Sequence, residues 1–399
     1  MKKLLALVLV LVFTLSAAGI IAYAAEDEKV FRIGAFVQLT GSTSVGGNEA
    51  KNSIEVAAKY INENGGFNGA KVVVDFNDTQ GSPEEAIKIA NQYIFAENYD
   101  AIIGSVNSNE CLAAFQYVND AEILAFGLGT AASWMAQDWE YIHRATMNNS
   151  LAAPLSLSLV TDMNYGKVAV FCGQDEASIN TANTFLELCK EANVEVVAFE
   201  KYDDGDVDYS AQIAKLIASN PDVIYTSLIG NDTGSAIKQI REGGWDGMII
   251  LKESYQTFSY EVSGPENSKY LAFANPYVCY SSVESCPDSL AEMKAYLPRY
   301  VELIGSLPTT DSGYRGWDAM MCLWEASKIA GANDTASMMA AIPSVSIEGL
   351  GGKLDFSDGT REGYGSHFNR FCFMAEEGSV LWQDWLDGYA EAFHADTGK

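Results

Sequence analysis

The chain has 399 residues, 48% of them hydrophobic and 11% aromatic, which is ample for packed cores and excludes a disordered protein. Acidic residues outnumber basic ones by 53 to 25, and the net charge of −28 argues against nucleic acid or anionic membrane as a partner. Since one domain usually has about 100–150 residues, we expect two lobes.

The first 24 residues have the features of a Sec signal peptide. Lys2 and Lys3 precede an apolar run over residues 4–15, and Ala22-Tyr23-Ala24 is an A-x-A cleavage pattern. A membrane anchor is the alternative, because the apolar stretch is almost long enough to span a bilayer. The cleavage pattern and the acidic residues 26–28 favour removal after Ala24.

Removal would leave 23 basic residues against 53 acidic ones, a net charge of −30. No cysteine lies near the cleavage site, so attachment as a lipoprotein is not expected. We therefore expect a soluble monomer in the periplasm.

The first half of the sequence alternates between buried-strand patterns and helical stripes. Expected strands are 30–37, 72–74, 101–104 and 123–126, and expected helices are 48–62, 83–94 and 111–119. This order predicts a doubly wound parallel sheet of the α/β class.

The same alternation of strand and helix patterns starts again after residue 149. Expected strands are 167–172, 194–199, 222–227 and 248–251, and expected helices are 180–191, 209–218 and 233–242. Further helices are expected at 290–304 and 317–329, and further strands at 353–356 and 371–374. Two similar units without a Gly/Ser or Pro linker predict two lobes joined by short connections that act as a hinge.

The seven cysteines are thinly spread and form no C-x-x-C motif, which excludes a zinc ribbon and a thioredoxin motif. Cys279 and Cys286 flank a polar stretch and are a candidate disulfide in an oxidising compartment. The odd count leaves at least one free thiol.

Two motifs suggest other sites, and we read both as structural. Residues 127–132 match G-x-G-x-x-A, but a dinucleotide fingerprint is expected after the first strand and not after the fourth. Asp204, Asp206 and Asp208 have the spacing of a calcium loop, but Tyr209 stands where glycine is needed. No catalytic dyad, cofactor motif or metal-ligand cluster is recognisable among the three histidines, so no enzyme, cofactor or metal is expected.

Several stretches resemble the leucine/isoleucine/valine-binding family, the type I periplasmic binding proteins that serve ABC importers. The stretch from residue 31 to 94 is similar to the opening of that family. Matching positions include Asn62, Gly65-Gly66, Gly69, Asp78, Gly104, Ser108, Asp208-Tyr209-Ser210, Pro221-Asp222 and 351–356. The resemblance covers the mature chain and implies two type I lobes joined by a multi-strand hinge. It implies crossings near 148–151, 272–278 and 345–352, with 25–150 plus 275–347 in one lobe and 151–274 plus 348–399 in the other.

The resemblance also implies the ligand-binding residues. Ser108, with its neighbour Asn107, falls on the position that binds the ligand carboxylate, and Gly129 and Thr130 fall on the next loop of that wall. Glu253 falls on the position that pairs with the ligand ammonium from the other lobe. Ser108 and Thr130 have a second interpretation, because Ser and Thr at such places commonly cap helices.

The pocket departs from the family where aromatic residues are usual. Gly46, Ala177 and Ile229 stand at those positions, which predicts a roomier pocket that Trp134, Tyr255 or Tyr314 would partly refill. The ligand could then be bulkier than leucine.

The resemblance implies an extracytoplasmic binding protein that captures an amino acid, with branched-chain amino acids favoured, and that docks on an ABC permease. Small amides and aromatic carboxylates are alternative ligands. A free-standing sensor that feeds a receptor and an enzyme built on the same fold are alternative functions. The lack of a signalling domain argues against the sensor, and the lack of a nucleophile–base pair argues against the enzyme.

Overall fold

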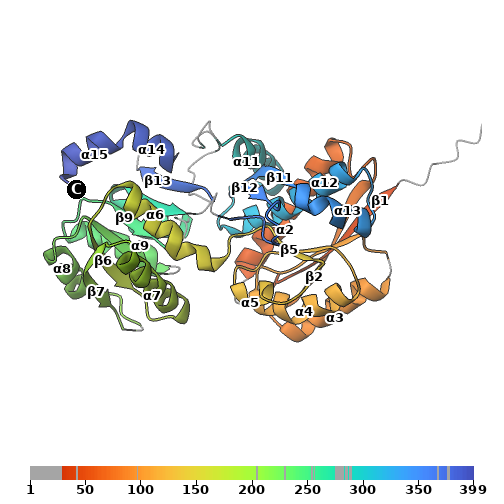
Figure 1. The fold of residues 1–399 in the computed structure, drawn as a ribbon, viewed down its shortest axis with the longest axis horizontal. Helices are drawn as coiled ribbons and strands as arrows, with labels where there is room; N and C mark the ends of the chain where they lie inside the picture. The colour runs from red at the N-terminus through yellow and green to blue at the C-terminus, as the bar shows by residue number, and fades with distance from the viewer. Residues whose placement is uncertain are drawn as a thin grey trace, which may run out of the picture.

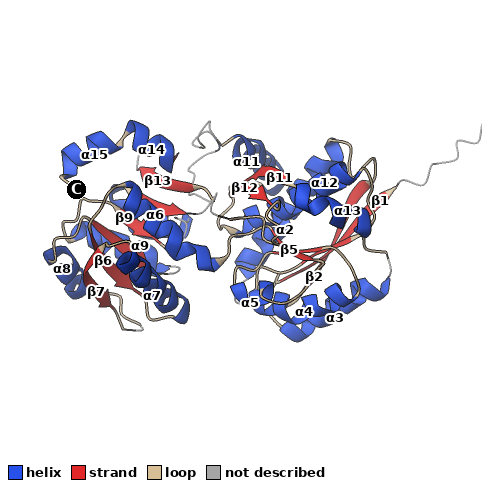
Figure 2. Cartoon of the chain, in the orientation of Figure 1, coloured by secondary structure: helices blue, strands red, loops and turns tan. Residues whose placement is uncertain are grey.

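The computed structural model has two lobes that lie side by side along the long axis of the molecule (Figure 1). It describes residues 29–399 except 42–43, 97, 204, 229–230, 253–254, 256, 275–282, 284–285, 287–289, 366–367 and 375–377. Each lobe has a sheet with helices on both faces (Figure 2). The predicted α/β, two-lobed fold is confirmed.

The first lobe is built on a five-stranded parallel sheet in the order β2-β1-β3-β4-β5. Its strands are β1 (Val30–Val37), β2 (Lys71–Asp78), β3 (Ala101–Ile103), β4 (Ala125–Gly127) and β5 (Ile142–Arg144). The central strands β3 and β4 are fully buried, as expected where helices cover both faces of a parallel sheet. Only β5 was not expected from the sequence, because its three residues are too few to show a pattern.

Two groups of helices cover this sheet. They are α2 (Ser44–Glu63), α3 (Pro83–Ala96), α4 (Ser108–Asp120), α5 (Ala132–Met135), α11 (Ala291–Ile304), α12 (Ser312–Ala330) and α13 (Thr335–Ala341). Helix α2 packs against α11 and α12, while α3 packs against α4. Ile89 of α3 and Phe115 of α4 share a core with Ile102 of β3, so these two helices close one face of the sheet.

The second lobe has a seven-stranded sheet in the order β14-β13-β10-β9-β8-β6-β7. Its strands are β6 (Lys167–Cys172), β7 (Glu195–Lys201), β8 (Val223–Ser227), β9 (Ile249–Leu251), β10 (Leu271–Ala274), β13 (Arg370–Met374) and β14 (Gly378–Leu381). Its helices are α6 (Ala152–Asp162), α7 (Glu176–Glu191), α8 (Ser210–Ala218), α9 (Asn231–Glu242), α10 (Thr257–Ser263), α14 (Trp382–Gly388) and α15 (Ala390–Thr397). Strands β6 to β10 are parallel, and β13 and β14 add an antiparallel edge. Within the described residues, no helix combines the length and apolarity that a membrane crossing needs.

The chain returns to the second lobe later than the predicted boundary at residue 348. The hairpin of β11 (Ser346–Gly349) and β12 (Gly352–Asp355) packs on the first lobe, where the N–H of Leu350 donates to the carboxylate of Asp318 in α12 at 2.8 Å. Residues 361–363 then run beside Arg144 and cover the free edge of β5. Residues 346–365 therefore belong to the first lobe. Phe368 and Asn369 still pair with Gly352 and Gly351, so the third crossing lies at the start of β13.

Four helices, α2, α4, α7 and α12, begin at least three residues earlier than the sequence suggests, and two of them change the setting of residues singled out above. Helix α7 begins at Glu176 and not near residue 180, because the carboxylate of Asp175 accepts a hydrogen bond from the N–H of Ser178 at 2.8 Å and caps it. Helix α2 begins at Ser44, so its first turn contains two glycines that look like loop residues in the sequence. Ala177 and Gly46, both expected in loops, therefore lie in the first turns of helices.

Candidate ligand-binding site

Two loops meet at the carboxyl end of the first sheet, which is where open α/β sheets bind ligands. The loop after β3 leads to Asn107 and Ser108, and the loop after β4 contains Gly129 and Thr130. Asn107 caps α4, since its side-chain oxygen accepts a hydrogen bond from the N–H of Asn109 at 3.0 Å. The capping role considered for Ser108 is therefore taken by its neighbour.

The hydroxyl of Ser108 connects the two loops. It accepts a hydrogen bond from the backbone N–H of Ala131 at 3.1 Å. A side chain at Gly129 would place its Cβ 2.7 Å from this hydroxyl oxygen and 2.9 Å from the Cα of Ser108, so only glycine allows the loops to approach so closely. The structure thus brings Ser108, Gly129 and Thr130 together at one edge, as the resemblance implies.

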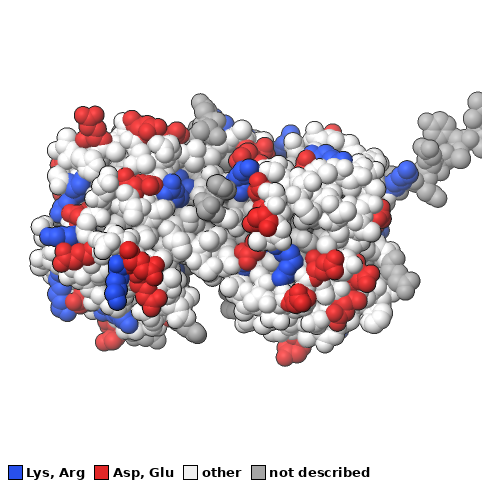
Figure 3. Space-filling view, viewed as in Figure 1, with Lys and Arg blue, Asp and Glu red and all other residues white. Residues whose placement is uncertain are grey.

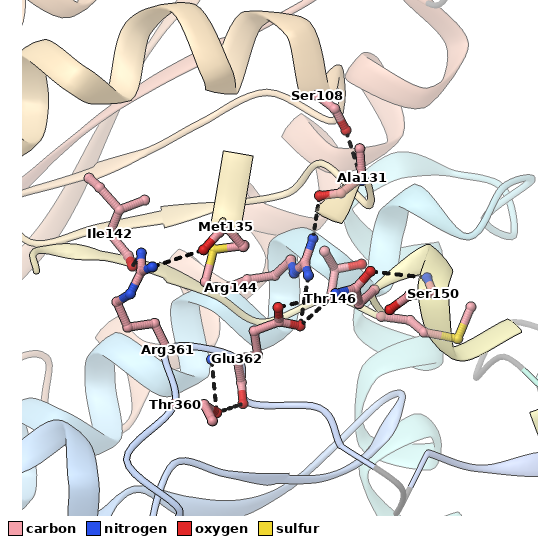
Figure 4. Close-up of polar contacts among 12 residues, drawn as sticks. Ser108, Ala131, Met135, Ile142, Arg144, Thr146, Ser150, Thr360, Arg361 and Glu362 are labelled. Atoms are coloured by element: carbon pink, nitrogen blue, oxygen red, sulfur yellow. Dashed lines mark hydrogen bonds and ion pairs between the residues drawn. The ribbon is translucent and has the colours of Figure 1, made fainter. Parts of the chain in front are cut away.

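A buried arginine holds the second loop from below (Figure 4). The guanidinium of Arg144 has no exposed side-chain surface; it donates to the carbonyl of Ala131 at 2.8 Å and forms an ion pair with Glu362 at 2.7 Å. Burial lowers the pKa of Arg144, and the charge of Glu362 opposes that shift. On the hinge side, the N–H of Asn149 donates to the carbonyl of Thr130 at 2.9 Å. The loop is therefore fixed to both the sheet and the hinge.

Gly46 lies at the same edge of the first lobe. A Cβ at this position would be 2.9 Å from the hydroxyl oxygen of Ser312 and 3.8 Å from Val106, in the loop that leads to Ser108. At the next position, a Cβ on Gly47 would be 1.8 Å from the carbonyl oxygen of Gln38. Gly47 lets α2 start against the residue that follows β1, and Gly46 lets the same turn lie close to Ser312.

A cavity of about 320 Å³ lies between the lobes beside the second loop. It is lined by Ala131, Ala132, Asn149, Ser150, Ala153, Ala177, Asn180, Thr181 and Thr184. The first two residues belong to the first lobe, the next three to the hinge and α6, and the last four to α7, which faces α5 across the gap between the lobes (Figure 2). The volume is within the range of about 300–1,000 Å³ found for small-molecule sites.

The cavity differs in charge from the rest of the surface. Acidic and basic side chains are spread over both lobes on the face shown in Figure 3. None of the nine described lining residues is charged. The lining therefore offers no counter-ion to a charged group of a ligand, and a charge buried without one is costly.

The second-lobe residues predicted from the resemblance are only partly described. Glu253 and Ile229 lie outside the described residues, and Glu253 remains a prediction. Tyr255 is fully buried, and its hydroxyl forms hydrogen bonds with those of Ser263, at 2.6 Å, and Ser268. Its ring packs within the second lobe, away from the cavity lining.

Trp134 and Tyr314, considered as rings that refill the pocket, also lie below its surface. Trp134 is fully buried, and the guanidinium of Arg144 lies 5.1 Å from its ring centroid. Tyr314 is 1% exposed, and its hydroxyl bonds with that of Thr146 at 2.8 Å. Neither ring is part of the described cavity lining.

The sequence did not identify the α7 residues that line the cavity from the second lobe, or Arg315, which lies beside the loop after β4. The α7 positions 180, 181 and 184 were missed, although Asp175 followed by Ser178 is a readable helix-capping signal. Arg315 was missed as well; its guanidinium bonds with Asp311 at 2.6 Å and with the carbonyl of Leu128 at 3.3 Å. No sequence motif could have placed a residue so distant in the chain beside the loop after β4.

The two alternative motifs have structural explanations. In G-x-G-x-x-A, a Cβ on Gly127 would lie 2.5 Å from Trp134, so this glycine serves packing. In the aspartate loop, Asp206 accepts a hydrogen bond from the N–H of Asp203 and Asp208 accepts one from the N–H of Ser210, which are local turn contacts. Over the described part of the chain, no group of three or more metal-ligating side chains comes together.

The comparisons with known proteins agree with this geometry. The model of a periplasmic binding protein family matches residues 30–367. The chain belongs to this family. Its members bind solutes, so the protein is a solute-binding protein and not an enzyme. The predicted relationship is confirmed.

Relatives and solved structures extend the comparison. The chain is 24% identical to the Leu/Ile/Val-binding protein homolog 7 of Brucella suis over 400 residues, covering 96% of each chain. It is similar in structure to the branched-chain amino acid transporter substrate-binding protein LivJ of Streptococcus pneumoniae, which was solved in complex with isoleucine. The TM-score is 0.67 and the sequence identity 19%, and the match covers 88% of this chain and 99% of LivJ. It is also similar to an ABC transporter substrate-binding protein of Desulfitobacterium hafniense in complex with Leu, with a TM-score of 0.66, 19% identity, and coverage of 88% and 100%. These likenesses support the two-lobed fold.

Proposed function

We propose that this protein captures an amino acid between its lobes outside the cytoplasm and delivers it to an ABC permease in the inner membrane. The observation that carries the proposal is the uncharged cavity that both lobes line, next to the loop joined to Ser108. The names of the relatives, and the isoleucine and leucine in two similar structures, support an amino acid as the ligand. Branched-chain amino acids are the first class to test.

In this proposal the first lobe holds the carboxylate end of the ligand. The carboxyl end of the first sheet presents the hydroxyl of Ser108, the first residue of the 13-residue helix α4, whose N-terminus carries a partial positive charge. Gly129 and Thr130 provide backbone groups beside it. Asn107 keeps the start of α4 in place, and the small Gly46 leaves room on that side.

The second lobe supplies the partner for the ammonium group, which we assign to Glu253, two residues after β9 ends. A carboxylate and an ammonium attract each other strongly only where water is excluded, so this contact favours the closed arrangement of the lobes. Ligand binding then shifts the population toward the closed form by its better contacts there, and the permease recognises that form.

Calorimetric titration with a panel of amino acids, small amides and aromatic carboxylates tests the proposal. Glu253→Ala should weaken amino-acid binding about 30-fold or more, because a buried charge pair that loses one partner costs about 2–5 kcal/mol. Glu261→Ala is the matched control, since this exposed glutamate of α10 lies outside the cavity lining. Amino-acid affinity within a few-fold of wild type in Glu253→Ala would contradict the ammonium role.

A further inference from the structure

The far wall of the cavity is longer than a branched-chain side chain needs. Its lining runs along α7 from Ala177 to Thr184, seven residues that span about 10 Å at 1.5 Å per residue. A leucine side chain extends over three carbon–carbon bonds, less than about 4.5 Å. Leucine held at the Ser108 edge would therefore leave much of this wall without contact.

The length of the wall depends on small residues. Ala177 opens the cavity at the start of α7, and Ala131, Ala132 and Ala153 line it from the other sides. A large ring at position 177 would fill the space next to Asn180, one turn further along the helix. The alanine thus gives a ligand access to the polar part of α7.

The polar groups on this wall are suited to a neutral hydrogen-bond donor. The hydroxyl of Thr181 donates to the carbonyl of Ala177 at 2.8 Å, and that of Thr184 donates to the carbonyl of Asn180 at 3.0 Å. Each hydroxyl has used its hydrogen, so its oxygen can only accept from a ligand. The exposed amide of Asn180 can both donate and accept. An amide or ureido group, which carries donors and an acceptor without charge, matches these partners.

We propose that the preferred ligand is an amino acid with a side chain longer than that of leucine, ending in an uncharged amide or ureido group that binds Asn180 and Thr181. This inference rests on the proposed function and specifies the ligand for the same cleft. It assigns specificity to α7, while the carboxylate and ammonium contacts stay as proposed above.

The test is calorimetric titration of the wild-type protein with leucine, glutamine, citrulline and glutamate. Glutamine or citrulline should bind at least tenfold more tightly than leucine, and glutamate, which has the shape of glutamine but a negative charge, should bind weakly. Asn180→Ala should weaken the amide or ureido ligand about three- to tenfold, the value of one net hydrogen bond, without changing leucine binding. Asn183→Ala is the matched control, an exposed asparagine on α7 outside the cavity lining.

A second variant tests whether the small side chain at position 177 makes room for the ligand. Ala177→Tyr places a ring at an exposed position, so folding should be unaffected, and it should weaken the long ligand at least tenfold while sparing leucine. Tightest binding of leucine, or equal effects of Asn180→Ala and Asn183→Ala, would overturn this inference and leave the proposed function intact. Failure of the folded wild-type protein to bind any amino acid would overturn the proposed function, and this inference with it.

Discussion

The ion pair below the ligand loop allows a quantitative prediction. Glu362→Gln keeps the shape of the side chain and removes its charge. The guanidinium of Arg144, which has no exposed surface, would lose its counter-ion, while its hydrogen bond to the carbonyl of Ala131 would remain. Burial lowers the pKa of a second guanidinium, that of Arg361, and repulsion from Arg144 adds to this shift, while Asp138 and Glu362 oppose it. Glu362 forms the ion pair with Arg144 and also offsets the charge of Arg361.

The size of the effect follows from burial. Removing one partner of a buried pair costs about 3–5 kcal/mol, because the other charge stays buried without compensation. The side chain of Glu362 is 26% exposed, so water reaches one side of the pair, and we expect a loss of about 3 kcal/mol in the free energy of unfolding. Arg144→Met added to Glu362→Gln removes the stranded charge, and the double variant should be more stable than Glu362→Gln alone.

Urea denaturation followed by tryptophan fluorescence measures these differences, and Trp134, 5.1 Å from the guanidinium, reports from the site. The four proteins of the double-mutant cycle give the coupling energy directly. A loss of less than about 1 kcal/mol in the free energy of unfolding of Glu362→Gln would show that the pair is not a stabilising buried ion pair. Additive losses in the double variant would show that the two side chains are not coupled.

Three further predictions concern other parts of the fold. Gly129→Val should destabilise the protein by about 1–3 kcal/mol and weaken ligand binding, because its Cβ would overlap Ser108. Thermal unfolding measures the stability, and calorimetric titration measures the affinity. An affinity equal to that of the wild type would contradict the close approach of the two loops. Burial raises the pKa of Asp318 from 3.8 to about 7, so the free energy of unfolding should fall as the pH rises from about 4 to 8. Asp318→Asn should remove this pH dependence. The same pH dependence of the free energy of unfolding in both proteins would contradict the prediction. If Cys279 and Cys286 form the expected disulfide, thiol titration of the non-reduced protein in denaturant should find five of its seven cysteines reactive, and seven would exclude the bond.

The sequence predicted the fold well because its signals are local and repeated. Parallel strands buried on both faces are continuous apolar runs, so β1, β6 and β8 were expected nearly at their observed positions. The three-residue strand β5 and the last crossing were not, because both depend on contacts between distant segments. The bond pattern of Arg144 with residues 361–363 spans more than 200 positions, and no local pattern encodes it.

The position of candidate site residues could be predicted only where they follow strand ends. Ser108, Gly129 and Thr130 lie just after β3 and β4, and parallel topology brings such loops together. The role of Tyr255 could not be judged in the same way, since whether a ring lines a pocket or packs beneath it depends on tertiary contacts. The face of α7 went unnoticed because, although residues 180–191 were expected to be helical, no local pattern shows which face of that helix borders the first lobe.

A crystal structure of the protein with the amino acid that binds most tightly in titration would show where the ligand lies. We expect it in the cavity between Ala131 and Ala177, with its carboxylate at Ser108 and its side chain along α7. A ligand bound elsewhere, such as in the groove of about 610 Å³ on the second lobe beside Ile213 and Gln239, would contradict this expectation.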